Sequence, residues 1–235
     1  MRMLSSVADY VFDAATPFGP FHTMRLTAVL QQDLETELEI ALVVRDPSLH
    51  EVRSVNGRVR FLQMALIAPD EEELIARWDA VRFSEELSAV TPMFVTELTR
   101  RSLLASDHAV LLRAAAKRDG SSRELEYLRQ LDEKFEVGMN KQVRLTLKGF
   151  EADLIARVLE MRVAHRRRAR LAVGGLTIAL LSTDDGFEPW TAATEDQVSI
   201  ALPPERVPEM VACLTARRAF SESWFRELTI EHQRA

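Results

Sequence analysis

The spacing of apolar residues changes several times along the chain, which predicts that helices and strands alternate. Residues 4–13 carry apolar side chains at helical spacing, and the prolines and glycine of residues 16–20 end that helix. Residues 38–44 alternate with a period of two, as does the start of residues 59–67, so both segments are expected to be strands. The almost unbroken apolar end of 59–67 predicts burial on both faces of the sheet.

A turn and an acidic helix start flank the second of these strands. The Asn-Gly pair at 56–57 favours positive φ and predicts a tight turn before the strand. Pro69 suits the first turn of a helix, where the dipole also favours the carboxylates that follow it. Leu74, Trp78 and Val81 are spaced by one and two helical turns, so we expect all three to face inward from this helix. An extended piece is expected to begin at Pro92.

The second half of the chain restarts the same alternation after a polar stretch. Residues 107–139 are expected to be helical, with a flexible break at Gly120-Ser121-Ser122. Strands are then predicted at 142–147 and 198–202, and an apolar hairpin through Gly174-Gly175. The predicted fold class is α+β, with strands and helices interleaved in one domain over residues 1–235. The alternative is two lobes, residues 1–106 and 140–235, joined by the polar helical segment 107–139.

Composition changes this picture little. With 235 residues, 47% hydrophobic and 28% charged, the chain is long enough to bury a sizeable core. It has no run of about 18 apolar residues, which argues against a membrane span, and acidic residues appear too early for a signal peptide. A single cysteine excludes an internal disulfide and a multi-cysteine zinc site. We therefore expect a cytoplasmic protein.

The charges leave several interpretations open. The net charge of −6 disfavours nucleic-acid binding and suits a basic partner, or solubility alone. Glu71 and Glu72 either match the dipole of a helix start or form part of an acidic patch for a basic partner. Five arginines between Arg162 and Arg170 lie without an acid at a predicted helix end, where cations are favoured. A protein-docking patch and a nucleic-acid contact are the alternatives for this basic tract.

No motif in the sequence carries a recognisable chemistry. Phosphate-binding glycine loops, the G-x-S-x-G nucleophile turn and H-E-x-x-H are absent, and the five histidines are not paired at helical spacing. We expect no metal and no cofactor. Asp184 and Asp185, with Glu188 nearby, are the best candidates for an assembled carboxylate site of a hydrolase-type enzyme, against a solvated loop. Trp190, after a proline, is a candidate surface anchor for a partner.

Four sequence blocks follow one another in a distinctive order and spacing in the first part of the chain. They are residues 8–12 with 18–19 and 22–23, residues 46–47 with 56–63, the helix of residues 72–78, and residues 95–102. Together they resemble the suppressor-of-fused domain, over about residues 4 to 104. Residues 144–147 and 198–203 are similar to the tail of bacterial members.

The resemblance implies a mixed α/β domain that binds proteins and is not known for catalysis. Animal members hold a transcription-factor peptide as an added strand, and bacterial members include immunity proteins that neutralise polymorphic toxins. Tyr10 coincides with a tyrosine of the animal cleft, whereas Phe21 and Arg45 stand where acidic cleft residues are expected. The sequence thus predicts a non-enzymatic, intracellular protein-binding module, with an immunity protein that covers a basic toxin domain as its specific form. A hydrolase and a structural homo-oligomer subunit are the alternatives, and the oligomeric state stays open.

The residues assigned to partner binding come from these several arguments. They are Tyr10, Glu71, Glu72, Asp184, Asp185 and Trp190.

Overall fold

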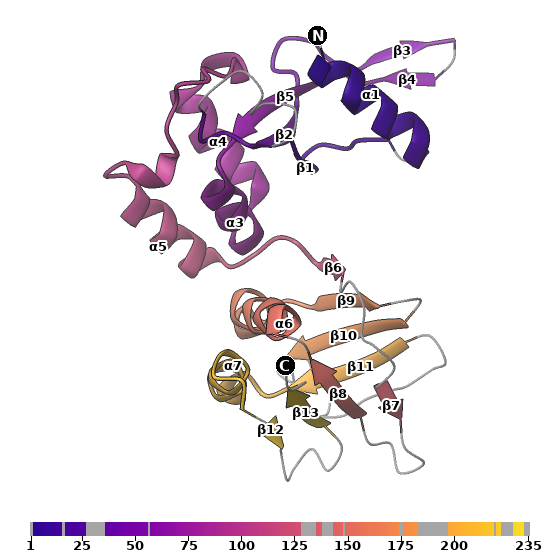
Figure 1. Cartoon of the computed structure of the whole chain (residues 1–235), viewed down its shortest axis with the longest axis vertical. Coiled ribbons are helices and arrows are strands. Elements are labelled where there is room, and N and C mark those ends of the chain that lie inside the picture. The colour runs from indigo at the N-terminus through magenta and orange to yellow at the C-terminus, as the bar shows by residue number, and fades with distance from the viewer. Residues whose placement is uncertain are drawn as a thin grey trace. The chain divides into compact units, whose positions relative to one another are not determined.

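The fold is that of a computed structural model (Figure 1). It describes residues 2–15, 17–26, 36–55, 57–127, 135–137, 143–147, 149–173, 176–182, 197–218, 220–221 and 228–232. The chain divides into two compact units, Met1–Arg118 and Asp119–Ala235. Each unit combines helices with sheets, which confirms the predicted α+β class.

The N-terminal unit contains a three-stranded antiparallel sheet in the order β1-β2-β5, a separate hairpin, and helices. Its elements are α1 (Arg2–Ala14), β1 (Thr23–Arg25), β2 (Ile40–Arg45), β3 (Val52–Ser54), β4 (Gly57–Val59), β5 (Leu62–Ile67), α3 (Pro69–Arg77), α4 (Ala80–Val90), α5 (Ala109–Asp119) and the 3₁₀ turns η1 (Pro92–Phe94) and η2 (Leu103–Ala105).

This sheet is covered on both faces. Ile40, Leu42 and Val44 of β2 pack with residues of α3, α4 and α5 in one apolar cluster. Ala41, between them, joins a second cluster with Leu66, against which Val7 of α1 packs. Because successive side chains of a strand point to opposite faces, β2 is buried throughout except at its last residue. The predicted burial of the end of β5 on both faces is confirmed.

The helix predicted to continue through Val81 is interrupted. Trp78 is buried as expected, but it ends α3, and Asp79 begins a new helix, α4. The Asp79 carboxylate accepts hydrogen bonds from the backbone N–H groups of Val81 and Arg82, at 2.9 and 3.0 Å. This cap resets the helical phase, so Val81 is exposed and Phe83 faces the core instead.

A second expectation also fails in this unit. Pro92 begins a 3₁₀ turn, η1, in place of an extended piece. Met93 and Phe94 in this turn have φ of 57° and 54°, in the left-handed region, which bends the chain back toward the sheet edge.

The hairpin β3–β4 is exposed along both strands, and an ionic cluster links its base. Glu51 Oε2 lies 2.6 Å from Arg60 Nε, and Glu51 Oε1 lies 3.6 Å from Arg58 Nη1. The hydrogen bond from Arg60 is the main reason that the pKa of Glu51 lies below its usual value, with the charge of Arg58 adding to it. Because the folded pKa is the lower one, this carboxylate stabilises the hairpin above its unfolded pKa, and the contribution is lost as pH falls through the folded pKa.

We expect Arg60→Gln to raise the titration midpoint of Glu51, because the substitution removes both the hydrogen bond and the positive charge. An NMR titration that follows the Glu51 side-chain carbonyl measures the midpoint directly. Arg53→Gln, on the neighbouring strand β3, is the matched control and should leave it unchanged. An unchanged midpoint in Arg60→Gln would show that the ion pair does not persist in solution.

Among its described residues, the C-terminal unit has two mixed sheets and two main helices. One sheet has the order β11-β10-β9-β6 and the other β12-β13-β8-β7. The elements are β6 (Leu125–Tyr127), β7 (Phe135–Val137), β8 (Val143–Leu147), α6 (Gly149–Met161), η3 (Val163–His165), β9 (Ala169–Val173), β10 (Leu176–Ser182), β11 (Gln197–Leu202), η5 (Pro204–Arg206), α7 (Val207–Thr215), β12 (Phe220–Ser221) and β13 (Leu228–His232). The predicted hairpin through 174–175 is confirmed by the antiparallel pairing of β9 with β10.

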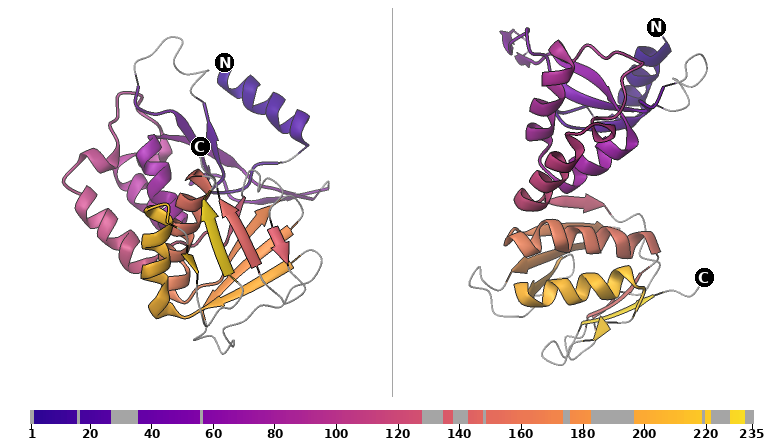
Figure 2. Two further views of the ribbon diagram at one scale, coloured as in Figure 1. Left: turned by 60° about the horizontal axis from the view of Figure 1, so that its bottom comes forward. Right: turned by 90° about the vertical axis from the view of Figure 1, so that its left-hand side faces the viewer.

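Helices α6 and α7 lie side by side and pack on one face of the first sheet (Figure 2). Ile155 and Leu159 of α6 and Leu214 of α7 share one buried cluster with strand residues such as Ile178 and Ile200. Apolar residues at three- and four-residue spacing on α6 and α7 therefore pack against the sheet and complete this core.

Of the described residues in the polar stretch predicted to be helical over 107–139, only those of α5 are in an α-helix. Beyond it, residues 125–127 pair with β9 in parallel, and residues 135–137 pair with β8. Both strands are only three residues long, so they show no clear alternating pattern, and the surrounding charges resemble a helix surface.

The expected flexible break is an ordered connection. Gly120 is buried with φ of +67°, and the Ser121 N–H donates to the Met161 carbonyl at 2.7 Å. The Ser121 carbonyl accepts a hydrogen bond from Arg162 Nη1 at 2.7 Å. The glycine serves a left-handed turn that L-residues rarely adopt, which is why the break looked flexible from sequence alone.

Candidate functional site

A buried ion pair holds the segment after η1 to the junction of β5 and α3. Arg100 Nη1 and Nη2 lie 2.7 and 2.9 Å from the two carboxylate oxygens of Glu71. The same carboxylate accepts the N–H groups of Ala68 and Leu103, at 2.7 and 2.8 Å, and Arg100 also donates to the Leu66 carbonyl at 2.9 Å. The Glu71 side chain is 0% exposed. It is therefore an internal clamp that positions residues 100–105.

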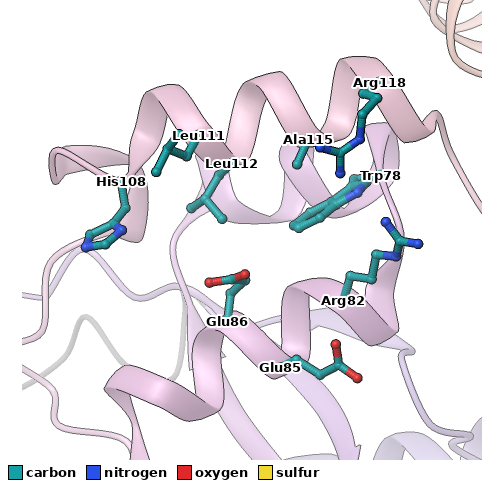
Figure 3. A pocket seen from close by; sticks show the side chains of 9 residues that line it. All are labelled: Trp78, Arg82, Glu85, Glu86, His108, Leu111, Leu112, Ala115 and Arg118. Carbon is teal, nitrogen blue, oxygen red and sulfur yellow. The ribbon is translucent and has the colours of Figure 1, made fainter.

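Beside this segment, two adjoining hollows lie between α4 and α5. The first, of about 480 Å³, has Trp78 at one end, and its walls carry Leu111, Leu112 and Ala115 (Figure 3). The second, of about 600 Å³, is lined mainly by apolar groups, among them Val90. Glu86, His108 and Leu112 line both hollows, so the two form one continuous groove, which we call the α4–α5 groove.

Charged side chains occupy defined places in the α4–α5 groove. Arg82 and Arg118 stand beside the Trp78 indole at one end, and His108 lies at the other end of the first hollow (Figure 3). The carboxylate of Glu86 points into the space between the helices, whereas that of Glu85 points away. Glu86 therefore places one carboxylate where the two hollows adjoin, next to Leu112, while Arg82 and Arg118 lie at the Trp78 end.

Most of the N-terminal unit is similar to a known protein family. Residues 1–101 match the family model of the suppressor of fused protein (SUFU). The matched residues include β1, β2, β5, α3, α4 and both members of the Glu71–Arg100 ion pair. A search of curated proteins finds no match.

One solved structure extends the SUFU-like fold beyond the matched residues. The crystal structure of Drosophila Suppressor of Fused matches with a TM-score of 0.76 and 16% identity, over 100% of this chain and 70% of the other. A second structure, titled as the Sufu-Fu complex, matches with a TM-score of 0.42 and 22% identity, over 47% of this chain and 48% of the other. The likeness to the Drosophila structure covers the residues of both units and shows the fold of this chain.

In the SUFU-like region, Tyr10 lies on the exposed side of α1. It is 52% exposed, and its ring stacks on Phe18 with centroids 5.7 Å apart. Phe18 meets the ring of His22 edge-on at 6.4 Å, and the Gly19 N–H donates to His22 Nδ1 at 3.2 Å. These contacts fix the loop before β1 and leave one face of the tyrosine open to solvent.

The two acidic candidates of α3 have different environments. Glu71 is removed from the surface by the clamp, so the expectation that it offers a carboxylate to a partner is not met in this structure. Glu72 keeps a partly exposed side chain, although Oε1 accepts a hydrogen bond from Thr23 Oγ1 at 2.7 Å and Oε2 lies 3.8 Å from Arg25 Nη2. Periodicity could not separate these neighbours, because both suit a helix start equally.

The remaining candidates, Asp184, Asp185 and Trp190, lie outside the described residues, as does Glu188. The structure therefore places Tyr10 and Glu72 on the surface of the same unit. The assignment of Asp184, Asp185 and Trp190 to partner binding stays a prediction. Among the residues that it describes, no group of three or more acidic, histidine or cysteine side chains could hold a metal ion. Within those same residues, no helix has the length and apolar character needed to cross a bilayer.

The basic tract of the C-terminal unit is partly structural. Arg162 is 7% exposed, and its Nη1 and Nε donate to the carbonyls of Ser121 and Arg168, both at 2.7 Å. Burial lowers the pKa of the Arg162 guanidinium, and the nearby charge of Arg167 lowers it further. Arg166, Arg167 and Arg168 are exposed, so only Arg162 belongs to the packed interior.

We expect Arg162→Lys to lower the free energy of unfolding of the C-terminal unit by about 2–3 kcal/mol, because one ammonium cannot serve two carbonyls that a guanidinium bridges. Amide hydrogen exchange in β9 and β10 reports on this unit. The exposed Arg168→Lys is the control, since it keeps the charge and the carbonyl. Equal protection in both variants would mean that the bridge adds no stability.

Sequence reasoning missed the α4–α5 groove entirely. Its lining comes from three segments, Trp78 with α4, residues 100–108, and α5, and no short motif joins them. The signal in the sequence was the apolar run of residues 110–112, which is wider than one helical face; the structure exposes Val110 and Leu111 and buries Leu112.

Proposed function

We propose that this chain is a non-catalytic protein-binding module of the suppressor-of-fused type. The observation that carries the proposal is the match of residues 1–101 to the SUFU model, together with the SUFU fold of both units. The family resemblance implies a protein partner, and the N-terminal unit offers open surfaces for one. Tyr10 supplies an exposed aromatic ring, and the α4–α5 groove supplies an apolar hollow.

The specific form that we propose is an intracellular immunity protein that binds a basic toxin domain and covers its active site. Such steric inhibition needs an interface of about 800 Å² per partner and no bond-making chemistry. The net charge of −6 supports a basic partner, because opposite charge accelerates encounter. Association should then slow as ionic strength rises.

The test is co-expression of this chain with the product of the neighbouring reading frame. If that frame encodes a large secreted protein, its C-terminal domain should co-purify with this chain and lose its toxicity. Co-purification without protection would retain protein binding and exclude immunity. Failure to bind any neighbouring product, combined with turnover of a small substrate by the purified chain, would overturn the proposal.

A further inference from the structure

The α4–α5 groove has the features of a docking site for a helix of another protein, and Tyr10 is not among the residues that line it. From Arg82 to Val90, α4 rises by about 12 Å at 1.5 Å per residue, so the groove accepts about two turns of a helix. Its walls include the exposed side chains of Val90 and Leu111, and its floor includes the buried Leu112.

The backbone around the groove favours an occupant that satisfies its own hydrogen bonds. The lining residues belong to α4, to α5 and to the segment 100–108. In that segment, the N–H groups of Ala105 and Ser106 bond to the carbonyls of Ser102 and Leu103. The N–H of Arg100 bonds to the carbonyl of Glu97, just before the segment, and that of Leu103 bonds to the Glu71 carboxylate. An extended peptide would find few backbone partners here, whereas a helix needs none.

Glu86 sets the charge preference at the middle of the groove, whereas Arg82 and Arg118 lie at the Trp78 end and Arg101 lines the second hollow. Glu86 lines both hollows and points into the groove (Figure 3). An apolar helix laid over it would strip water from the carboxylate without giving it a partner, which costs free energy. A lysine or arginine at that position would pair with it, while the flanking apolar residues fill the two hollows.

We infer that the α4–α5 groove binds an amphipathic helix of a partner protein that carries one lysine or arginine between two apolar residues. The inference rests on the proposed protein-binding function and deepens it by naming the surface and the chemistry of the partner. Apolar side chains about one turn to either side of the basic residue enter the hollows near Trp78 and near Val90.

The test uses a displayed library of randomised helical peptides, selected on the intact chain. Enriched peptides should carry a lysine or arginine flanked by apolar residues at helical spacing. Labelled copies should bind Glu86→Lys at least about tenfold more weakly, and peptides with glutamate in place of the basic residue should bind this variant better than the wild type. Leu111→Glu should abolish binding of both peptides.

Matched controls separate the groove from the rest of the surface. Glu73→Lys, on the exposed face of α3, should leave peptide affinity unchanged. The inference is overturned if selected peptides lack a basic residue, if Glu86→Lys binds them as the wild type does, or if the intact chain dimerises through this face and Leu111→Glu makes it monomeric. If the natural partner still binds Glu86→Lys normally, the groove assignment fails while the proposed function stands.

Discussion

Glu71→Gln should lower the free energy of unfolding of the N-terminal unit by about 3–5 kcal/mol, because it leaves the buried guanidinium of Arg100 without a counter-charge. The carboxylate accepts four hydrogen bonds, two from Arg100 and one each from the N–H groups of Ala68 and Leu103. An amide nitrogen in place of either oxygen would face two donors. Hydrogen exchange of the β2 and β5 amides measures the loss within this unit.

Two comparisons make the Glu71 experiment specific. Glu73→Gln removes a carboxylate on the same helix whose ion pair with Arg77, at 3.1 Å, is exposed, and it should cost no more than about 0.5 kcal/mol. The double variant Glu71→Gln with Arg100→Met should cost less than the sum of its two single variants, because the groups share one network. Additive costs would show that the clamp is not a coupled pair.

Gly120→Ala should destabilise the C-terminal unit by about 3 kcal/mol or more, from backbone strain and steric overlap together. At φ of +67°, an added Cβ would lie 2.5 Å from the Met161 carbonyl oxygen and 2.7 Å from His165 Cδ2. The carbonyl belongs to the backbone, so the overlap is relieved only by moving α6 or the backbone at Gly120. We expect faster hydrogen exchange in β6 and β9, with β2 and β5 unchanged.

Gly57→Ala is the control for the Gly120 experiment. It also has positive φ, at +113°, but nothing lies within 4 Å of an added Cβ. Gly57→Ala therefore carries backbone strain without overlap, and a larger loss in Gly120→Ala reports the overlap. Equal losses of stability in the two variants would mean that the connection at Gly120 adjusts freely and does not contribute to the stability of the C-terminal unit.

Much of the fold follows from patterns that are local in sequence. Strand β2 overlaps residues 38–44, where period-two spacing predicts it, and β11 overlaps the strand predicted at 198–202. The error at Val81 has a local cause too, because Asp79 can cap a new helix as readily as it can lie within one. Apolar spacing alone could not decide between these outcomes.

The candidate site was less predictable because its geometry is not local. Glu71 looked like any acidic residue in a first helical turn, and its partner Arg100 lies 29 residues further on. The α4–α5 groove joins Trp78 to residues of α5 more than 30 positions away. Spacing cannot reveal such contacts. The resemblance of the sequence blocks to the SUFU domain, in contrast, correctly predicted which family model matches residues 1–101.

The strand order of the second sheet has a consequence for the synthesis of the chain. β8 pairs in parallel with β13, so residues 143–147 wait for residues 228–232 before this ladder can form. Among the described residues, the strands of the N-terminal sheet, β1, β2 and β5, in contrast pair with one another, and all three precede residue 68. A nascent chain on the ribosome can therefore complete the first unit early, while the second becomes resistant to proteolysis only once its final strand has emerged.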